Sequence, residues 1–171
     1  MSETNIIEFT IIYNRHKKKL YNYLLKLVSD TMLAEDILQT VFLKFYQNLP
    51  GMKNKSGAEL WLFRTARNEA FTHFRSRKVQ NREVLPDDDD FDISDKALFE
   101  SEMELKEVGE LISEELEKMT YENREVFILK EYNGFSYSEI ASILGMDEQS
   151  VKSRLFKVRR KIIDKISVKI R

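Results

Sequence analysis

Residues 134–161, with the sequence GFSYSEIASILGMDEQSVKSRLFKVRRK, constrain the fold of this chain more than any other stretch. Ser136 and Glu139 have the spacing of a capping box, in which each side chain bonds the backbone amide of the other at the start of a helix. Gly145 can leave that helix with a positive φ, and Asp147 can cap a second helix. The segment predicts two helices joined by a tight turn.

The second of these helices has two different faces. Its apolar residues recur at spacings of four, three, four and four, which makes one core-facing stripe at helical period. The stripe consists of Val151, Leu155, Val158, Ile162 and Ile166. Amide, hydroxyl and basic side chains occupy the outward face and its flanks, and they are Gln149, Ser150, Lys152, Ser153, Arg154, Lys157, Arg159 and Arg160.

Such a pair of helices is what a helix-turn-helix needs in order to enter the major groove of DNA. Glutamine can pair with adenine and arginine with guanine through two hydrogen bonds each, while Lys and Arg neutralise phosphates. The alternative is a surface helix of an α-helical bundle whose charges are only solvated. The pattern alone leaves both open, because many helical hairpins share it.

The segment also resembles region 4 of bacterial sigma factors, in which G-x-S-x-x-E-I-A-x-x-L-G leads into V-K-S-R-L and a basic tail. Response-regulator DNA-binding domains are similar to it as well. Gln149 and Ser150 stand where the sigma family commonly has Gly-Thr, which predicts a shifted promoter preference. Met119 and Thr120 replace the usual Leu-Pro before region 4, and Thr120 can cap that helix instead.

Composition indicates a helical protein of one domain or two small ones. The chain has 171 residues, of which 33% are charged, with only 5 Gly and 2 Pro. It has no cysteine, which excludes disulfides, thiolate catalysis and Cys-based zinc sites. No apolar run approaches the ~18 residues of a membrane span, and no signal peptide is recognisable. We therefore expect a cytoplasmic protein without direct membrane insertion.

Charge is strongly segregated along the chain. Residues 1–80 carry 13 basic and 7 acidic side chains, residues 81–118 carry 4 and 15, and residues 119–171 carry 11 and 7. Two basic ends around an acidic middle indicate two nucleic-acid-facing modules and a connector that repels or mimics their ligand. Alternatively, the acidic residues only keep a linker solvated and extended.

Amphipathic patterning predicts an all-α fold, with helices over residues 6–28, 31–49 and 58–78 and a loop over 50–57. The apolar set of the second helix is too wide for one stripe, so we expect part of it to meet a partner. Helical character resumes at residues 97–119. A compact free form, with both basic modules folded onto the acidic linker, is a further hypothesis.

A second signature lies in this first module. AEDILQTVFLKFYQNL at residues 34–49 and WLFRTARNEAFTHFRSRK at residues 61–78 resemble the A-E-D-x-x-Q-x-x-F and W-L-x-x-I-A-R-N-x-x-x-D-x-x-R patterns of sigma region 2. Together with the region 4 signature, the chain is identified as a member of the extracytoplasmic-function (ECF) sigma factors, which have regions 2 and 4 only. Thr65 and Thr72 depart from the family's usual Ile and Asp.

The resemblance implies two small helical domains, with region 2 at residues 1–80, an acidic linker at 81–96 and region 4 at 97–171. Region 2 would dock on the β′ coiled coil of core RNA polymerase and hold the melted −10 element; region 4 would bind the β flap and read the −35 duplex. The implied docking residues are Glu35, Asp36, Gln39 and Phe42. The implied −10 contacts are Lys53, Asn54, Lys55, Ser56, Trp61, Arg64, Arg67, Asn68 and Arg75. Phe42 and Trp61 have the alternative of being core residues.

Two other classes of function remain as alternatives, together with one implied partner. A dimeric helix-turn-helix regulator would need palindromic sites and would leave the region 2 signature unexplained. An enzyme is not expected, because His16 and His73 lie on separate helices and no catalytic, metal-binding or cofactor-binding motif is present. An anti-sigma factor is a further partner that the resemblance implies.

Overall fold

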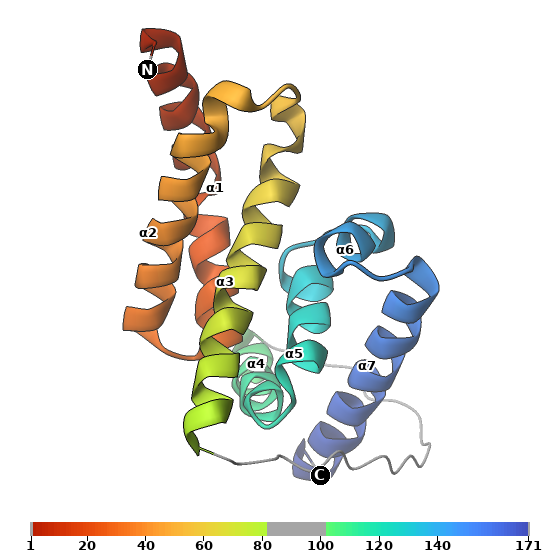
Figure 1. Cartoon of the computed structure of the whole chain (residues 1–171). Coiled ribbons are helices and arrows are strands. Elements are labelled where there is room, and N and C mark those ends of the chain that lie inside the picture. The colour runs from red at the N-terminus through yellow and green to blue at the C-terminus, as the bar shows by residue number, and fades with distance from the viewer. Residues whose placement is uncertain (1, 82–101, 171) are drawn as a thin grey trace.

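The computed structural model describes residues 2–81 and 102–170, and these residues form helices and no strand. The all-α prediction is therefore confirmed for this part of the chain (Figure 1). The predicted acidic linker, residues 81–96, lies almost entirely outside the described residues. The α-helices are α1 (Glu3–Val28), α2 (Thr31–Asn48), α3 (Ala58–Asn81), α4 (Glu102–Glu117), α5 (Tyr121–Phe127), α6 (Tyr137–Leu144) and α7 (Glu148–Ile170).

Helices α1, α2 and α3 pack against one another as a three-helix bundle. Its core is closed by aromatic contacts, such as that between Phe45 of α2 and Trp61 of α3, whose ring centroids are 5.5 Å apart. Because α2 contacts both α1 and α3, its wide apolar set is mostly buried inside the bundle. The large apolar side chains of α2 that are exposed are instead Met32 and Leu43, which the predicted set did not include.

Helices α4 to α7 form a second half, and the local signals in the sequence place their ends. The Ser136 hydroxyl accepts from the Glu139 amide at 3.1 Å, and the Glu139 carboxylate accepts from the Ser136 amide at 2.8 Å, which completes the predicted capping box. Gly145 ends α6 with φ at 67°. The Ser150 amide donates to Asp147 at 2.9 Å, so Asp147 caps α7 as predicted.

The helix that begins at Tyr121 is not regular throughout. Thr120 caps its start, as the sequence predicts, through a bond from the Asn123 amide. After Phe127 the chain widens into a π-helical turn, η3 (Ile128–Tyr132), which the sequence did not indicate. Such turns distort a helix locally and are frequent at functional sites. Here η3 lies against α1 and is part of the junction between the two halves.

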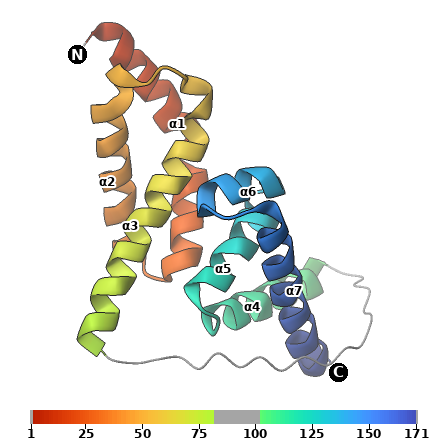
Figure 2. The ribbon, with the colours of Figure 1, turned by 45° about the vertical axis from the view of Figure 1, so that its right-hand side comes forward.

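The two halves are in direct contact (Figures 1 and 2). Helix α6 lies across the middle of α3, while η3 and α5 contact α1. The Phe63 and Phe135 rings meet edge to face across this junction, with centroids 4.9 Å apart. Arg124 of α5 donates to the Leu27 carbonyl at the end of α1, at 2.8 Å. The two described halves are therefore packed directly against each other. The hypothesis that both modules fold onto the acidic linker concerns residues outside the described ranges.

Candidate nucleic-acid and protein interfaces

The outward face of α7 carries most of the residues predicted to read duplex DNA. The stripe from Val151 to Ile166 is buried, as predicted, and this fixes the rotation of the helix. Gln149, Lys152, Ser153 and Lys157 are exposed on the opposite side. Exposed amide, hydroxyl and ammonium groups on one helix can bond base edges and phosphates without any prior rearrangement.

The other predicted residues of α7 differ in their contacts, and the Nη2 atom of Arg160 has no hydrogen-bond partner among the described residues. The Ser150 hydroxyl donates to Asp147 at 2.8 Å, and this residue's amide and hydroxyl together lower the pKa of the Asp147 carboxyl. Arg159 pairs with Glu131 of η3. Arg154 and Arg160 are half-buried, and the Arg160 guanidinium lies 6.0 Å from the Phe156 ring.

Phe156 was not among the predicted contact residues, although it lies in the centre of the α7 face. Its side chain is 62% exposed. A phenyl ring in this position can contact the methyl group of a thymine. Its outward direction was already evident from the helical period, since it lies opposite the buried stripe.

The loop before α3 presents the residues predicted to hold a base of the −10 element. Lys53, Asn54, Lys55 and Ser56 are all exposed. The Asn54 side-chain oxygen accepts from the Ser56 amide at 3.1 Å and so caps the short turn η2 (Lys55–Gly57), while the Lys55 ammonium pairs with Glu8 of α1. These bonds hold the loop in shape at the tip of the first bundle.

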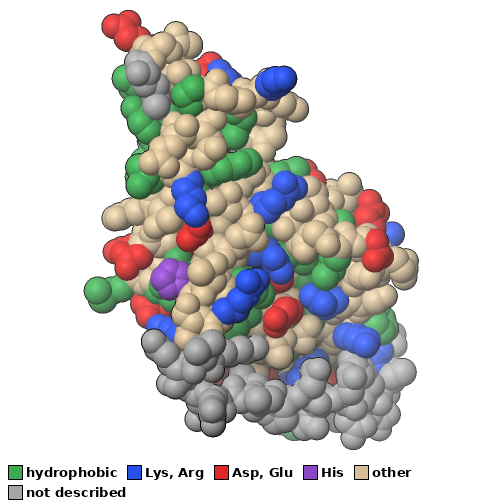
Figure 3. Space-filling model, in the orientation of Figure 1, with side chains coloured by type: hydrophobic (Ala, Val, Ile, Leu, Met, Phe, Trp, Pro, Cys, Tyr) green, Lys and Arg blue, Asp and Glu red, His purple; other side chains and the backbone are tan. Residues whose placement is uncertain are grey.

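The predicted −10 contacts on α3 differ in their surroundings. Asn68 and Arg75 are exposed, whereas Trp61 is half-buried and packs on Phe45. Arg64 donates to the Ser142 hydroxyl at 2.6 Å and to the Ser142 carbonyl at 3.2 Å. Figure 3 shows Lys and Arg side chains on the face where α3 meets the second half. No feature of the sequence predicts the bonds between Arg64 and Ser142.

Arg67 makes a bidentate ion pair between the halves. Its Nε and Nη2 atoms donate to the two carboxylate oxygens of Glu125 at 2.9 and 3.2 Å. The Glu125 side chain is fully buried and that of Arg67 is 20% exposed. Burial raises the pKa of Glu125 to about 7, although the bond from Arg67 acts in the opposite direction. The buried Tyr23 hydroxyl close by has no hydrogen-bond partner among the described residues.

The predicted polymerase-docking face of α2 is partly exposed. Glu35, Asp36 and Gln39 are on the surface. Phe42 is only 4% exposed, and its ring centroid lies 4.7 Å from that of Tyr13. Phe42 is therefore a core residue in this structure and is not available as a surface contact. The reason is the rotation of α2, which turns Phe42 toward α1 and leaves its neighbour Leu43 on the outside.

Two apolar residues of this face were not predicted as docking contacts. Met32 is 77% exposed and Leu43 is 58% exposed. Both lie at helical spacing from Asp36 and Gln39, so they belong to the same outward side of α2. The spacing is visible in the sequence, but which side of the helix faces outward depends on how α1 and α3 pack against it.

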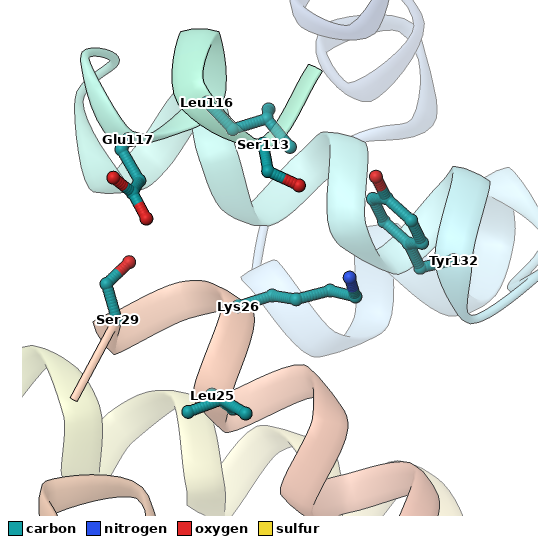
Figure 4. Close-up of a pocket in the computed structure, with 7 residues that line it drawn as sticks. All are labelled: Leu25, Lys26, Ser29, Ser113, Leu116, Glu117 and Tyr132. Atoms are coloured by element: carbon teal, nitrogen blue, oxygen red, sulfur yellow. The ribbon is translucent and has the colours of Figure 1, made fainter. Parts of the chain in front are cut away.

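A crevice of about 280 Å³ lies where the end of α1 meets α4 and η3 (Figure 4). The Lys26 ammonium lies 4.0 Å from the centre of the Tyr132 ring at its edge. One cation and one carboxylate, Glu117, do not converge on a common point in it (Figure 4). The crevice is therefore a gap between packed helices, and its lining does not form a binding site for a small ligand.

Comparison with known families agrees with both signatures. The family profile described as Sigma-70 region 2 matches residues 12–79, and that described as Sigma-70, region 4 matches residues 109–162. The ECF RNA polymerase sigma factor SigX of Bacillus subtilis is 30% identical over 160 residues, which cover 90% of this chain and 82% of the relative. The RNA polymerase sigma-H factor of Pseudomonas aeruginosa is 27% identical over a region that covers 90% of this chain and 83% of the relative.

Solved structures have the same fold. The sigma factor RpoE of Bartonella quintana, crystallised with the anti-sigma factor NepR, superposes with a TM-score of 0.72 at 24% identity, covering 94% of this chain and 97% of that one. CnrH, solved in complex with the cytosolic domain of CnrY, superposes with a TM-score of 0.66 at 21% identity. The superposition covers 94% of this chain and 88% of that one.

This chain therefore belongs to the extracytoplasmic-function sigma factors of bacterial RNA polymerase, with regions 2 and 4. It functions as a sigma factor, and the dimeric regulator is not favoured. Proteins of this family are in general regulators of transcription initiation without enzymatic activity. Within residues 2–81 and 102–170, no helix is both long and apolar enough to cross a membrane.

Proposed function

We propose that this sigma factor uses three separate surfaces to start transcription at specific promoters. The face of α2 docks on core polymerase, the loop before α3 and the polar face of α3 hold the melted −10 strand, and the face of α7 reads the −35 duplex. Residues 1–80 and 97–171 act as the two domains, and residues 81–96 connect them. One observation carries this proposal: the α2 and α7 faces are both exposed although the two halves are packed together.

The α2 face suits a protein partner. It combines the carboxylates of Glu35 and Asp36 and the amide of Gln39 with the exposed side chains of Met32 and Leu43. Apolar anchors surrounded by polar groups are typical of protein–protein interfaces. We assign this face to the β′ coiled coil of core polymerase, and we replace Phe42 in the docking set by Leu43. Region 4 meets the β flap.

The α7 face suits duplex DNA. Gln149 and Ser153 can bond base edges in the major groove, while Lys152 and Lys157 neutralise phosphates on either side. Phe156, between them, adds an apolar contact for a thymine methyl group. A single module with this few contacts binds weakly and with strong salt dependence, so we expect specificity to arise in the holoenzyme.

The −10 surface suits a single strand. Asn54 and Ser56 can bond the edge of an unstacked base. Lys53 and Arg75 are exposed basic groups, and Trp61 is half-buried. Basic groups track the backbone of a single strand, and aromatic rings stack on its bases. Helping to melt the −10 element would follow from this preference for unpaired bases.

We further propose that an anti-sigma factor regulates this protein. Support comes from the similar structure of RpoE, which was solved with the anti-sigma factor NepR. CnrH was likewise solved with a protein partner, the cytosolic domain of CnrY. The exposed apolar residues of α2 are a suitable contact for it, since covering them would also block polymerase docking. Leu43→Ala should therefore weaken the binding of the anti-sigma factor and the binding of core polymerase together.

Transcription in vitro tests the docking assignment. Core polymerase and genomic DNA from the organism that encodes the chain are combined with wild-type protein, with a Gln39→Ala, Leu43→Ala variant, and with an Asn14→Ala, Ile11→Ala control. The control removes the same kinds of exposed side chain from α1. We expect specific transcripts from the wild type and the control, and at least about a tenfold loss in the α2 variant. Equal transcription by all three would refute the α2 assignment.

A further inference from the structure

Helix α1 carries an exposed apolar patch that none of the proposed contacts uses. Ile6, Ile7 and Ile11 are 49%, 61% and 51% exposed, and all three lie in the first three turns of the helix. Phe9, which lies among them in the sequence, turns inward onto Phe42 of α2. The bundle is therefore closed without the three isoleucines, and a contiguous exposed apolar patch of this kind marks an interaction site.

Three exposed cations follow the patch along the same helix, and they are Arg15, Lys17 and Lys18. Spacings of four, four and three residues keep side chains on one side of a helix. The side chains with this spacing are Ile7, Ile11, Arg15 and Lys18, which we call the α1 stripe. It is about 17 Å long at the rise of an α-helix, with an apolar part at one end and a cationic part at the other.

The α1 stripe faces away from the rest of the bundle. Helix α1 uses its other sides for packing, since Phe9 meets α2 and Lys19 pairs with Glu59 of α3. The second half contacts α1 near the other end of this helix, where the Lys26 ammonium lies on the Tyr132 ring. The stripe is therefore accessible along its whole length.

Nearby acidic residues do not cancel the charge of the stripe. Glu8 pairs with Lys55 of the loop before α3, and Glu3 lies in the first turn, where the helix dipole is positive. Figures 1 and 2 show this end of α1 far from α4. Helix α4 exposes four carboxylates, those of Glu107, Glu110, Glu114 and Glu117. An anionic surface would therefore orient the molecule with the start of α1 foremost.

Isoleucines beside cations fit the surface of an anionic lipid bilayer. Lys and Arg bind the headgroup phosphates, and the apolar side chains enter the boundary between headgroups and acyl chains. The stripe is the convex outer side of one helix, to which a fluid bilayer can adapt. Nucleic acid fits less well, because its phosphate backbone offers the isoleucines no apolar partner.

We propose that the α1 stripe, flanked by Ile6 and Lys17, is a peripheral binding site for anionic phospholipid membranes. Helix α1 lies along the surface, with Ile7 and Ile11 in the headgroup boundary and the cations on lipid phosphates. Few side chains take part, so binding is weak and reversible. The stripe is separate from the α2, α3 and α7 surfaces, and the inference does not rest on the function proposed for them.

Flotation of the full chain with vesicles tests the apolar part. We expect about tenfold stronger binding to phosphatidylcholine vesicles with about 30% phosphatidylglycerol than to pure phosphatidylcholine, and release by salt. Ile7→Ser, Ile11→Ser should bind the anionic vesicles about tenfold less tightly. Met32→Ser, Leu43→Ser, which removes exposed apolar side chains from α2, should bind as the wild type does. Equal losses in both variants would overturn the α1 assignment.

A second pair of variants tests the cations. Arg15→Gln, Lys18→Gln should weaken binding to the anionic vesicles about tenfold. Lys157→Gln, Lys161→Gln removes the same charge from exposed positions of α7 and should change binding less than about twofold. Equal losses would show unspecific attraction of a basic surface and would overturn the site. Circular dichroism verifies that each variant is folded.

A fluorescent label reports whether α1 enters the lipid. The chain has no cysteine, so an environment-sensitive fluorophore can be attached at exposed Asn14→Cys, and at Glu107→Cys of α4 as a control. Anionic vesicles should shift the emission of the α1 label to the blue and leave the α4 label unchanged. An unchanged α1 label would overturn the proposal. Absent vesicle binding, with loss of single-stranded oligonucleotide binding in Arg15→Gln, Lys18→Gln, would assign the stripe to nucleic acid instead.

Discussion

The arginines of α3 and the basic face of α7 have similar chemistry and different surroundings. Arg64 and Arg67 are bound to residues of the other half, whereas Lys152 and Lys157 of α7 are exposed, and Arg159 pairs within its own half. The difference shows that a cationic side chain predicted to bind DNA can also be a structural contact of the free protein. Which role it takes depends on the placement of the halves.

The largest effect is expected for Arg124, the basic residue most deeply involved in structure. Its guanidinium donates to the carbonyls of Leu27, Leu116 and Glu117 at 2.8, 2.8 and 2.6 Å. Arg124→Ala leaves these buried acceptors without their donor, so the free energy of unfolding should fall by about 3 to 5 kcal/mol. Urea denaturation measures it. Arg159→Ala, which breaks an exposed pair, should cost less than about 1 kcal/mol.

A pH effect is expected at the pair between the halves. Burial raises the pKa of Glu125 from its ordinary value of 4.5 to about 7, so the folded state binds a proton that the unfolded state has released. Its contribution to stability is full below about pH 4.5 and is lost as the pH rises through 7. The free energy of unfolding should therefore fall by about 1.4 kcal/mol between pH 6 and pH 8.

Comparison with Glu125→Gln isolates this effect, because the substitution removes the titrating carboxyl and retains the other groups. The charged and titratable neighbours are Arg67, Tyr23, Glu122 and Arg154. The difference between the two profiles of unfolding free energy against pH should give the contribution of Glu125 to stability. Parallel profiles for wild type and variant between pH 6 and 8 would show that the carboxyl is ionised throughout.

A smaller effect is expected on the α7 side. Lys157→Ala removes one exposed ammonium from the proposed duplex face, so holoenzyme binding to promoter DNA should weaken about fivefold and the salt slope should fall by about 1. Filter binding at several salt concentrations measures both. Lys165→Ala makes the same change on the same helix two turns further from the turn, and we expect it to leave affinity and slope unchanged.

The smallest effect concerns the turn that orients α7. Gly145 has φ at 67° and nothing lies within 4 Å of an added Cβ, so Gly145→Ala should cost only backbone strain, about 1 kcal/mol. Gly109 lies inside α4 and is equally open. The same substitution there should instead stabilise the protein by about 0.5 to 1 kcal/mol. Thermal unfolding distinguishes the opposite signs.

Local signals in the sequence predicted the local structure well. The capping box at Ser136, the caps at Thr120 and Asp147, and the positive φ of Gly145 each depend on neighbours within a few residues. The buried stripe of α7 also follows from period alone. These features, together with the two signatures, were enough to predict the fold class and the family.

Contacts between distant residues were not predictable in this way. Arg67 and Glu125 are 58 residues apart, and each reads in the sequence as an ordinary charged residue of an amphipathic helix. Phe42 and Leu43 are adjacent apolar residues, and only the packing of α1 and α3 decides which of them is buried. The sequence therefore predicted which surfaces make up the site. It did not predict which residues of those surfaces are buried by packing within and between the halves.

The central claim is that the two halves contact different forms of DNA. The most direct test measures promoter binding and promoter melting on the same holoenzymes. Holoenzymes with Asn54→Ala, Arg64→Ala and with Gln149→Ala, Lys157→Ala are compared on a promoter with 2-aminopurine in its −10 element. The account predicts that the first variant binds the duplex normally and melts it about tenfold less, while the second loses binding and melting together. Equal loss of duplex binding in both variants would contradict it.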